Sequence, residues 1–245
     1  MENIITVRDV KRSFPMSGGQ EFFALQGVDM DIPVGKLTIL KGRSGSGKTT
    51  LLNILSALDD ATSGEVLFSD QKFSEMSMGE KEKLRRYHVG FVFQSVALIP
   101  IMSAYENVDF GLRLAEYGEN RDKRIKEVLK LVGLLKRMSH MPNQMSGGEQ
   151  QRVAIARAVA HKPKVIFADE PTGALDTASG LQVIRLFKQL IKEEGITIVM
   201  TTHDPGLMEF GDVVYEMEDG AIISKEEHVV DNLSQSAGGE TNFEE

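Results

Sequence analysis

The sequence predicts an α/β fold built around a largely parallel sheet. Helix and strand patterns alternate along most of the chain, and two short, mainly apolar runs at residues 165–168 and 196–201 have the length of buried strands. Parallel strands that are covered on both faces have this composition. A helical stretch at about 179–194 separates the two runs, and strand–helix–strand order implies parallel strands joined by a right-handed crossover.

The other elements follow from local patterns. Residues 4–10 alternate as a strand does, and residues 15–20 contain Pro, Ser and two Gly, as expected of a loop. The further expected elements are strands at 22–32, 37–40, 64–68 and 89–93, a helix at about 48–58, a mostly helical stretch at 94–160, and a hairpin formed by 213–217 and 221–224 around Asp219-Gly220. The basic face at 121–137 is interrupted by Asp122 and Glu127, which is typical of a solvated helix rather than a nucleic-acid patch.

Composition excludes several classes of protein. There is no cysteine, so neither a disulfide scaffold nor a thiolate metal site is possible. No apolar run approaches the roughly 20 residues that span a bilayer. The formal net charge is −8, but six acids and no Lys or Arg lie in 226–245, which leaves −2 for residues 1–225. The nearly balanced body has no basic field that would favour nucleic acid.

A glycine-rich segment separates the expected strand at 37–40 from the following helix. It is a complete Walker A motif: Gly42, Arg43, Ser44, Gly45, Ser46, Gly47, Lys48, Thr49, with Thr50 next in the helix. Glycines let backbone N–H groups turn inward around phosphate oxygens, and the helix adds its positive N-terminal end. Lys48 is placed to reach the β- and γ-phosphates, and the Thr49 hydroxyl to hold Mg²⁺. The strand–turn–helix context makes a chance glycine turn the weaker interpretation.

Two acids, Asp169 and Glu170, follow the apolar run at 165–168. Ligands of open α/β sheets bind at the carboxyl ends of strands, so Asp169 is expected beside the phosphate loop, where it can hold Mg²⁺ directly or through water. Glu170 points differently and is the candidate general base that polarises the attacking water. Two acids at a strand end are common on surfaces, but the Walker A motif favours the functional interpretation.

A second pair of glycines opens a helix after Ser146. Ser146 and Glu149 have the spacing of a capping box. Capping does not explain Gly147 and Gly148, because each glycine weakens a helix by about 1 kcal/mol relative to alanine. They fit a backbone that something approaches closely. A helix N-terminus with a free hydroxyl is an anion site, so this segment predicts a contact with the γ-phosphate of an ATP shared by two chains.

Together these motifs resemble the ABC ATPases. Residues 145–149 are similar to that family's signature, ordinarily Leu-Ser-Gly-Gly-Gln, with Met145 in place of leucine and Glu149 in place of glutamine. The resemblance covers about residues 1–225. It implies a P-loop NTPase core of the RecA type with an antiparallel β subdomain and an inserted α-helical subdomain at about 94–161. It also implies that the signature of one subunit completes the ATP site of the other.

The same resemblance assigns three polar residues. Gln94 is similar to the Q-loop glutamine, which senses Mg²⁺ and the attacking water and lies beside the partner's coupling helix. Asp176, in the segment 173–176, resembles the D-loop aspartate that reaches across the dimer. His203 resembles the switch histidine that contacts the γ-phosphate. For Gln94 the alternative is an ordinary glutamine at the end of a strand. A lone histidine is usually structural, but His203 follows an expected core strand at the sheet edge where the phosphates are expected.

Phe14 is the best match for the aromatic residue that stacks on adenine, where tyrosine is more usual. Phe22 and Phe23 are competitors because the loop at 15–20 blurs the spacing, and a buried core phenylalanine is a third interpretation.

Within the family, the chain is most similar to ATPase subunits of the macrolide-exporter and lipoprotein-release type. That similarity implies a head-to-tail homodimer closing on two ATP·Mg²⁺ at the cytoplasmic face of a bacterial membrane. The dimer would drive a separate integral-membrane permease, with no nucleic-acid partner. We expect the acidic tail at 226–245 to be disordered.

Two other functions are weighed against this one. A non-transport ABC ATPase acting in DNA repair, division or translation would carry a long coiled-coil insertion or two cassettes, and this chain has neither. A GTPase would carry Asn-Lys-x-Asp, which is absent, and a small-molecule kinase would have no use for the Ser146 turn. Neither transported substrate nor direction follows from the sequence.

Overall fold

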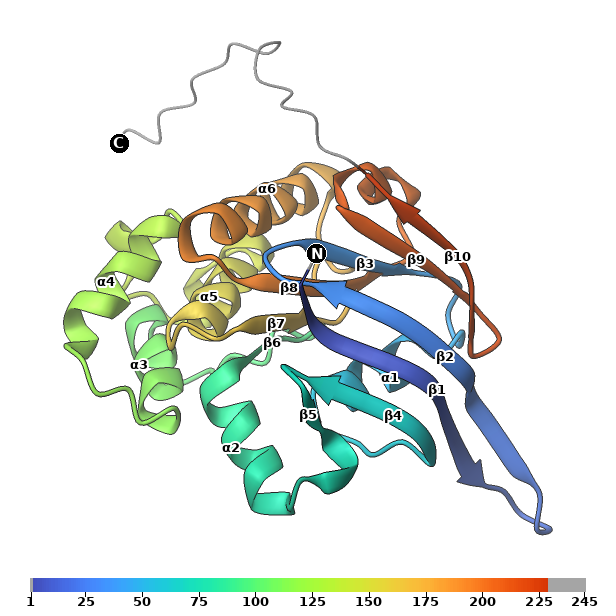
Figure 1. Ribbon diagram of the computed structural model, residues 1–245. Coiled ribbons are helices and arrows are strands. Elements are labelled where there is room, and N and C mark those ends of the chain that lie inside the picture. Colours follow the sequence, from blue (N-terminus) through green and yellow to red (C-terminus); the bar gives the residue numbers. More distant parts are fainter. Residues whose placement is uncertain (1, 229–245) are drawn as a thin grey trace.

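Two sheets form the centre of the protein in the computed structural model, which describes residues 2–228 (Figure 1). The larger sheet has the strand order β10-β9-β3-β8-β7-β6. Its strands are β3 (Leu37–Lys41), β6 (Val89–Val92), β7 (Val165–Ala168), β8 (Thr197–Thr202), β9 (Val213–Glu218) and β10 (Ala221–Glu227). Neighbouring strands are parallel except β9 and β10, which form the expected antiparallel hairpin. The prediction of a parallel sheet is confirmed.

The smaller sheet is antiparallel, with the order β2-β1-β4-β5. Its strands are β1 (Asn3–Pro15), β2 (Glu21–Pro33), β4 (Ser63–Phe68) and β5 (Gln71–Lys72). The hairpin of β1 and β2 extends beyond the body of the molecule, with its turn at residues 16–20 (Figure 1). Both strands are longer than the sequence predicts, because they continue to pair past the point where apolar alternation ends.

Helices lie around the larger sheet (Figure 1). They are α1 (Lys48–Leu55), α2 (Met78–His88), α3 (Ala104–Leu114), α4 (Arg121–Leu131), α5 (Gly147–Val159) and α6 (Thr177–Glu194), with short 3₁₀ turns at Phe73–Glu75, Leu135–Arg137, Pro142–Gln144 and Pro205–Phe210. Helix α1 ends earlier than expected, shortly before Ala57 takes a left-handed φ of 57°. Helix α2 was not predicted from the sequence.

The core has two parts, one on each face of the larger sheet. Ile166 and Ala168 pack with the residues of α3–α6, whereas Val165 and Phe167 pack with α1 and the smaller sheet. Successive side chains of a strand point to opposite faces. A strand buried on both faces must therefore be apolar at every position, which explains the composition of β7.

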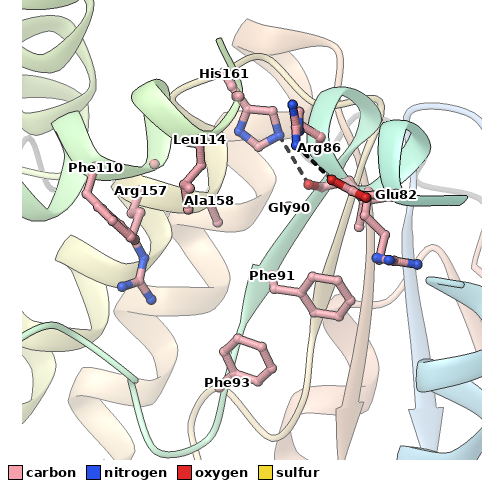
Figure 2. A pocket seen from close by; sticks show the side chains of 14 residues that line it. Glu82, Arg86, Gly90, Phe91, Phe93, Phe110, Leu114, Arg157, Ala158 and His161 are labelled. Carbon is pink, nitrogen blue, oxygen red and sulfur yellow. Dashed lines mark hydrogen bonds and ion pairs between the residues drawn. The ribbon is translucent and has the colours of Figure 1, made fainter. Parts of the chain in front are cut away.

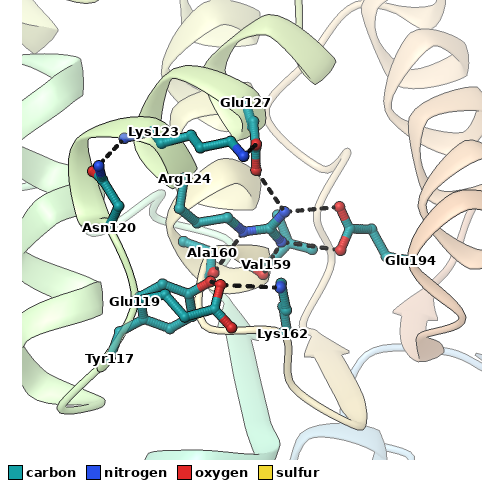
Figure 3. Close-up of polar contacts among 10 residues, drawn as sticks. All are labelled: Tyr117, Glu119, Asn120, Lys123, Arg124, Glu127, Val159, Ala160, Lys162 and Glu194. Atoms are coloured by element: carbon teal, nitrogen blue, oxygen red, sulfur yellow. Dashed lines mark hydrogen bonds and ion pairs between the residues drawn. The ribbon is translucent and has the colours of Figure 1, made fainter.

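A buried arginine ties α4 to the rest of the protein (Figure 3). Arg124 is 5% exposed, and its two terminal nitrogens lie 3.0 Å from the two carboxylate oxygens of Glu194, the last residue of α6. Its Nε donates to Ala160 O at 2.9 Å, just after α5 ends. Losing one partner of such a buried pair costs about 3–5 kcal/mol. This contact anchors α4 and the end of α5 to the end of α6.

The acidic C-terminal segment begins inside the sheet. Glu226 and Glu227 belong to β10, and Glu226 Oε1 lies 3.7 Å from Lys41 Nζ. The expectation of disorder in the tail otherwise falls on 229–245, outside the described residues. Within the described part of the chain, no helix combines the length and apolar character that a membrane span requires.

Candidate nucleotide-binding site

The carboxyl ends of four parallel strands meet at one edge of the larger sheet. The phosphate-loop segment 42–47 follows β3, Gln94 follows β6, Asp169 and Glu170 follow β7, and His203 follows β8. In open α/β sheets this edge is where ligands bind. The topology therefore gathers side chains that are far apart in the sequence.

Two glycines give the loop at 42–47 its shape. Gly42 has a φ of 154° and Gly47 a φ of 99°, and a Cβ would lie 2.4 Å from Met217 O at the first and 2.6 Å from Ala24 O at the second. Both positions exclude any side chain, because backbone atoms cannot move aside. At Gly45, with a φ of 82°, no atom lies within 4 Å of a Cβ, so that side of the loop is open.

Lys48 reaches into the loop that precedes it. Its Nζ donates to the carbonyl oxygens of Gly42 and Arg43, each at 2.8 Å. Burial lowers the pKa of Lys48, and the nearby carboxylates of Glu170 and Asp169 oppose that shift. Ser46 is 5% exposed, and its buried hydroxyl has no partner within residues 2–228. The loop thus holds a cation and an unpaired hydroxyl, which suits an anionic oxygen ligand.

Asp169 lies between two threonine hydroxyls. Thr49 Oγ1 is 3.1 Å from Asp169 Oδ2, and Thr201 Oγ1 donates to Asp169 Oδ1 at 2.7 Å. Mg²⁺ prefers oxygen ligands and is usually held by one or two carboxylates together with substrate phosphates. Thr49 and Asp169 fit that donor set. Residues 2–228 hold no cluster of three or more His, Cys, Asp or Glu that could bind a metal without phosphate.

The Glu170 side chain lies close to two other predicted catalytic residues, His203 and Gln94. Its Oε1 lies 3.4 Å from His203 Nδ1, its Oε2 lies 3.4 Å from Gln94 Nε2, and its backbone N–H donates to Thr201 Oγ1 at 2.8 Å. The residue has a φ of 43°, which is unfavourable for a side-chain-bearing residue. Such strain is typical of functional sites. Sequence reasoning missed Thr201, whose only sign was a hydroxyl at the end of an apolar strand.

A second group of predicted residues lies at the N-terminal ends of α5 and α6. Ser146 caps α5: its hydroxyl accepts from Glu149 N at 3.3 Å, and its own N–H donates to Glu149 Oε2 at 2.8 Å. A Cβ on Gly148 would lie 3.4 Å from Ser179 Oγ. Asp176 caps α6 by accepting from Ser179 N at 2.9 Å. Ser146, Gly148 and Asp176 are therefore neighbours.

The two acidic residues of this second group, Glu149 and Asp176, already have partners within the chain. Glu149 also pairs with Arg137 at 3.1 Å, so its carboxylate serves the cap of α5 within the chain. Gly147 is next to Leu175, whose Cδ2 would lie 3.8 Å from a Cβ there. Gly173 lies beside Gln94, with 3.3 Å between its Cβ position and Gln94 Nε2. The segment at 170–176 thus connects the two groups.

Phe14 lies on the projecting hairpin, directly opposite Phe22 in the register of β1 and β2. The Arg12 guanidinium carbon is 4.6 Å from the centre of the Phe14 ring. Phe14, Phe22 and Phe23 are 37%, 53% and 47% exposed. None of the three is a core residue, so the interpretation of Phe14 as a buried core phenylalanine is wrong. All three rings are accessible.

The fold and the loop at 42–49 define a protein that binds nucleotide phosphates at the edge of a parallel sheet. Comparison with known protein families identifies the class of this nucleotide-binding protein. The sequence of residues 25–173 matches the ABC transporter family. The chain belongs to this family and is one of its ATPase cassettes.

Relatives agree with that membership. The chain is 43% identical to the uncharacterized ABC transporter ATP-binding protein MJ0796 of Methanocaldococcus jannaschii, covering 91% of this chain and 97% of that protein. It is 39% identical to the lipoprotein-releasing system ATP-binding protein LolD 2 of Rhodopirellula baltica, covering 98% and 93%. It is 42% identical to the macrolide export ATP-binding/permease protein MacB of Agrobacterium fabrum, but spans only 35% of that longer protein. The predicted branch of the family is thereby confirmed.

A solved structure shares the fold. The dimeric post-hydrolysis structure of MJ0796, bound to ADP and Pi, superposes with a TM-score of 0.82 at 40% identity, covering 91% of this chain and 98% of that one.

Proposed function

We propose that the chain hydrolyses ATP at the edge formed by β3, β6, β7 and β8, and that it drives a separate membrane permease. The contacts of Glu170 carry this proposal, because its carboxylate lies within 3.4 Å of both Gln94 and His203. One carboxylate beside an amide and an imidazole can orient a water molecule for in-line attack on a phosphate.

The phosphate-loop residues would bind and orient the substrate. The backbone N–H groups of 42–47 and the N-terminus of α1 would cradle the phosphates, while Lys48 would exchange its two carbonyl partners for phosphate oxygens. His203 would contact the γ-phosphate. Positioning and charge stabilisation supply most of the catalysis in such sites.

Thr49 and Asp169 would hold Mg²⁺, with Gln94 approaching from the end of β6. The bound cation would neutralise charge that develops on the phosphate oxygens. Thr201 keeps the Asp169 carboxylate in place through its hydrogen bond of 2.7 Å. Thr49, Asp169 and Gln94 are thus the side chains that this chain would contribute to the metal site, and Thr201 supports one of them.

Two copies would share each nucleotide. Gly147 and Gly148, which follow Ser146, lie beside the N-terminus of α6, with Leu175 next to Gly147 and Ser179 next to Gly148. A helix N-terminus with two glycines is suited to an anion supplied from outside the chain. The γ-phosphate held by the loop of a second copy has that charge, and Asp176 lies beside the same helix end. MJ0796, which is similar over nearly its whole length, is dimeric in its solved structures.

An open apolar groove next to the site suits a permease segment. It has a volume of about 420 Å³ and lies between α2, β6, α3 and α5, with Phe91, Phe93, Phe110 and Leu114 along it (Figure 2). Phe93 is 41% exposed and Leu114 58% exposed. Phe93 directly precedes Gln94, so an occupant would lie next to a proposed catalytic residue. We place the chain, as a peripheral subunit, at the cytoplasmic face of a membrane.

Replacing Glu170 with Gln tests the proposal. Glu170→Gln keeps the size of the side chain and the contact with Gln94 but cannot accept a proton. We expect ATP turnover to be lost and an ATP-bound dimer to accumulate, measured by phosphate release and by size-exclusion chromatography with ATP and Mg²⁺. Glu193→Gln, near the C-terminal end of α6 and away from the site, is the control and should leave turnover unchanged. Normal turnover in Glu170→Gln would overturn the assignment of the base.

A further inference from the structure

The backbone just after Gln94 is strained. Val96 has a φ of 61° and Ala97 a φ of 48°. This left-handed region is unfavourable for residues with a side chain, and most of all for a β-branched valine. Local bonds give partial support, from Val96 N to Phe93 O at 3.1 Å and from Ala97 N to Ser95 O at 2.6 Å. Strained conformations persist only where the surrounding structure holds them.

A single arginine holds both strained residues. Arg157 Nη1 donates to Ala97 O at 2.8 Å, and Nη2 lies 3.4 Å from Val96 O. The guanidinium is planar, so it fixes the two carbonyls relative to each other in a way that a flexible ammonium cannot. Burial lowers the pKa of Arg157, yet arginine keeps its proton at physiological pH.

Helix α3 leaves room for this side chain. Gly111 lies inside α3, where glycine is unfavourable for a helix. A Cβ at Gly111 would lie 2.9 Å from Arg157 Cγ and 3.3 Å from Arg157 O. In Figure 2 the Arg157 side chain extends away from His161, towards the end of the groove where Phe93 lies. Packing therefore explains the glycine at position 111, because it leaves space for the Arg157 side chain beside α3.

We infer that Arg157 is a positioning residue for ATP hydrolysis: it fixes the backbone at 96–97 and thereby holds the Gln94 amide against Glu170. Gln94 Nε2 lies 3.4 Å from Glu170 Oε2, and a short stretch of backbone separates it from the two carbonyls that Arg157 binds. The inference rests on the proposed function, because the catalytic part of Gln94 is itself proposed there.

Arg157 also links the two groups of site residues. It lies near the C-terminal end of α5 (Gly147–Val159), the helix that Ser146 caps at its other end. A rigid helix that moves with the nucleotide of the second copy would carry Arg157 with it and shift the backbone at 96–97. One helix thus connects the shared phosphate contact to the glutamine of the chain's own site.

The test measures steady-state ATP hydrolysis by the full chain with Mg²⁺. We expect Arg157→Gln to lower kcat on the order of tenfold, a size typical of a misplaced catalytic group, with KM for ATP little changed. Arg157→Lys should fall between Arg157→Gln and the native chain, because an ammonium can hold one carbonyl well. Gly111→Ala should lower kcat in the same direction by displacing the arginine without removing it. Arg113→Gln is the matched control, since Arg113 pairs with Asp109 at 2.6 Å on the exposed side of α3.

A double-mutant cycle with Gln94 decides between positioning and general destabilisation. In a Gln94→Ala background, Arg157→Gln should lower kcat no further, because its effect passes through that amide. An equal loss in both backgrounds, or native kcat in Arg157→Gln, would overturn the inference. Native kcat in Gln94→Ala would instead overturn the proposed function of Gln94. If Arg157→Gln does not fold, as judged by thermal unfolding, Arg157→Lys and Gly111→Ala enter the same cycle.

Discussion

The hydroxyl of Thr201 donates a hydrogen bond of 2.7 Å to Asp169. The same oxygen accepts from the backbone N–H of Glu170 at 2.8 Å. One buried side chain of β8 therefore sets the direction of two consecutive acids that follow β7. The carboxylate proposed to hold Mg²⁺ and the carboxylate proposed as general base both depend on it.

The Thr201→Val substitution tests whether Thr201 acts through its two hydrogen bonds rather than through packing alone. Valine matches the shape of threonine but leaves Glu170 N without its acceptor and Asp169 with Thr49 as its remaining hydroxyl partner, which costs about 1–3 kcal/mol of unfolding free energy. Displacement of the base should lower kcat on the order of tenfold to a hundredfold. The measurements are urea unfolding and phosphate release.

Thr38→Val is the matched control for Thr201→Val. Thr38 is fully buried in β3, and its hydroxyl has no partner in the part of the chain that the structure describes. Removing an unpaired buried hydroxyl should keep or raise the unfolding free energy and leave kcat unchanged. Equal effects of the two substitutions on kcat would contradict the role given to Thr201.

Ser146→Ala should weaken the dimer beyond its effect on the helix. Ser103 caps α3 with the same capping box that Ser146 forms at α5. Each Ser→Ala substitution should lower the unfolding free energy by about 0.5–2 kcal/mol. Only Ser146→Ala should reduce the fraction of ATP-bound dimer, measured by size-exclusion chromatography in the Glu170→Gln background. A similar loss of dimer in Ser103→Ala would show that helix stability alone is responsible.

Phe14→Ala should raise KM for ATP if the ring stacks on adenine. Base–aromatic stacking contributes about 1–3 kcal/mol, which corresponds to a rise of about fivefold to 150-fold. Phe14→Tyr should keep the native KM for ATP. Phe22→Ala is the control on the opposite strand, because Phe22 pairs with Phe14 and is 53% exposed. A rise in KM confined to Phe22→Ala would move the stacking position to that residue.

The fold could be predicted wherever burial constrains the composition. β7 is covered on both faces, so its four residues are all apolar and it is visible in the sequence. α2 buries only Leu84, and its other apolar residue, Met78, is exposed, so it shows no helical periodicity of apolar residues. The one local signal of this helix is the capping box of Ser77 and Glu80 at its N-terminus.

The site could be predicted where backbone geometry demands a residue type. Gly42 and Gly47 exclude side chains, and the loop is therefore visible as a motif. Thr201 and Arg157 are ordinary residues for a strand and a helix, and their contacts with Glu170 and Ala97 join segments far apart in the chain. No local pattern records such contacts, because they depend on how the sheet and helices are assembled.

Glu149→Gln should make stability less dependent on pH. The backbone N–H of Ser146 donates to the carboxylate and lowers the pKa of Glu149 below its ordinary value of 4.5; burial opposes this shift, and Arg137 adds to it. The folded chain therefore binds this proton less tightly than the unfolded chain does. The stabilisation is fully present above the unfolded pKa and is lost as the pH falls through the folded pKa.

Glutamine can still accept the Ser146 N–H but carries no charge. The difference in unfolding free energy between the native chain and Glu149→Gln should thus be largest at neutral pH and should shrink below pH 4.5. Urea unfolding of both proteins at several pH values measures it. Other carboxylates titrate in both chains and cancel from the difference. A difference that stays constant with pH would mean that the charge of Glu149 contributes nothing to the cap of α5, and that the cap depends on hydrogen-bond geometry alone.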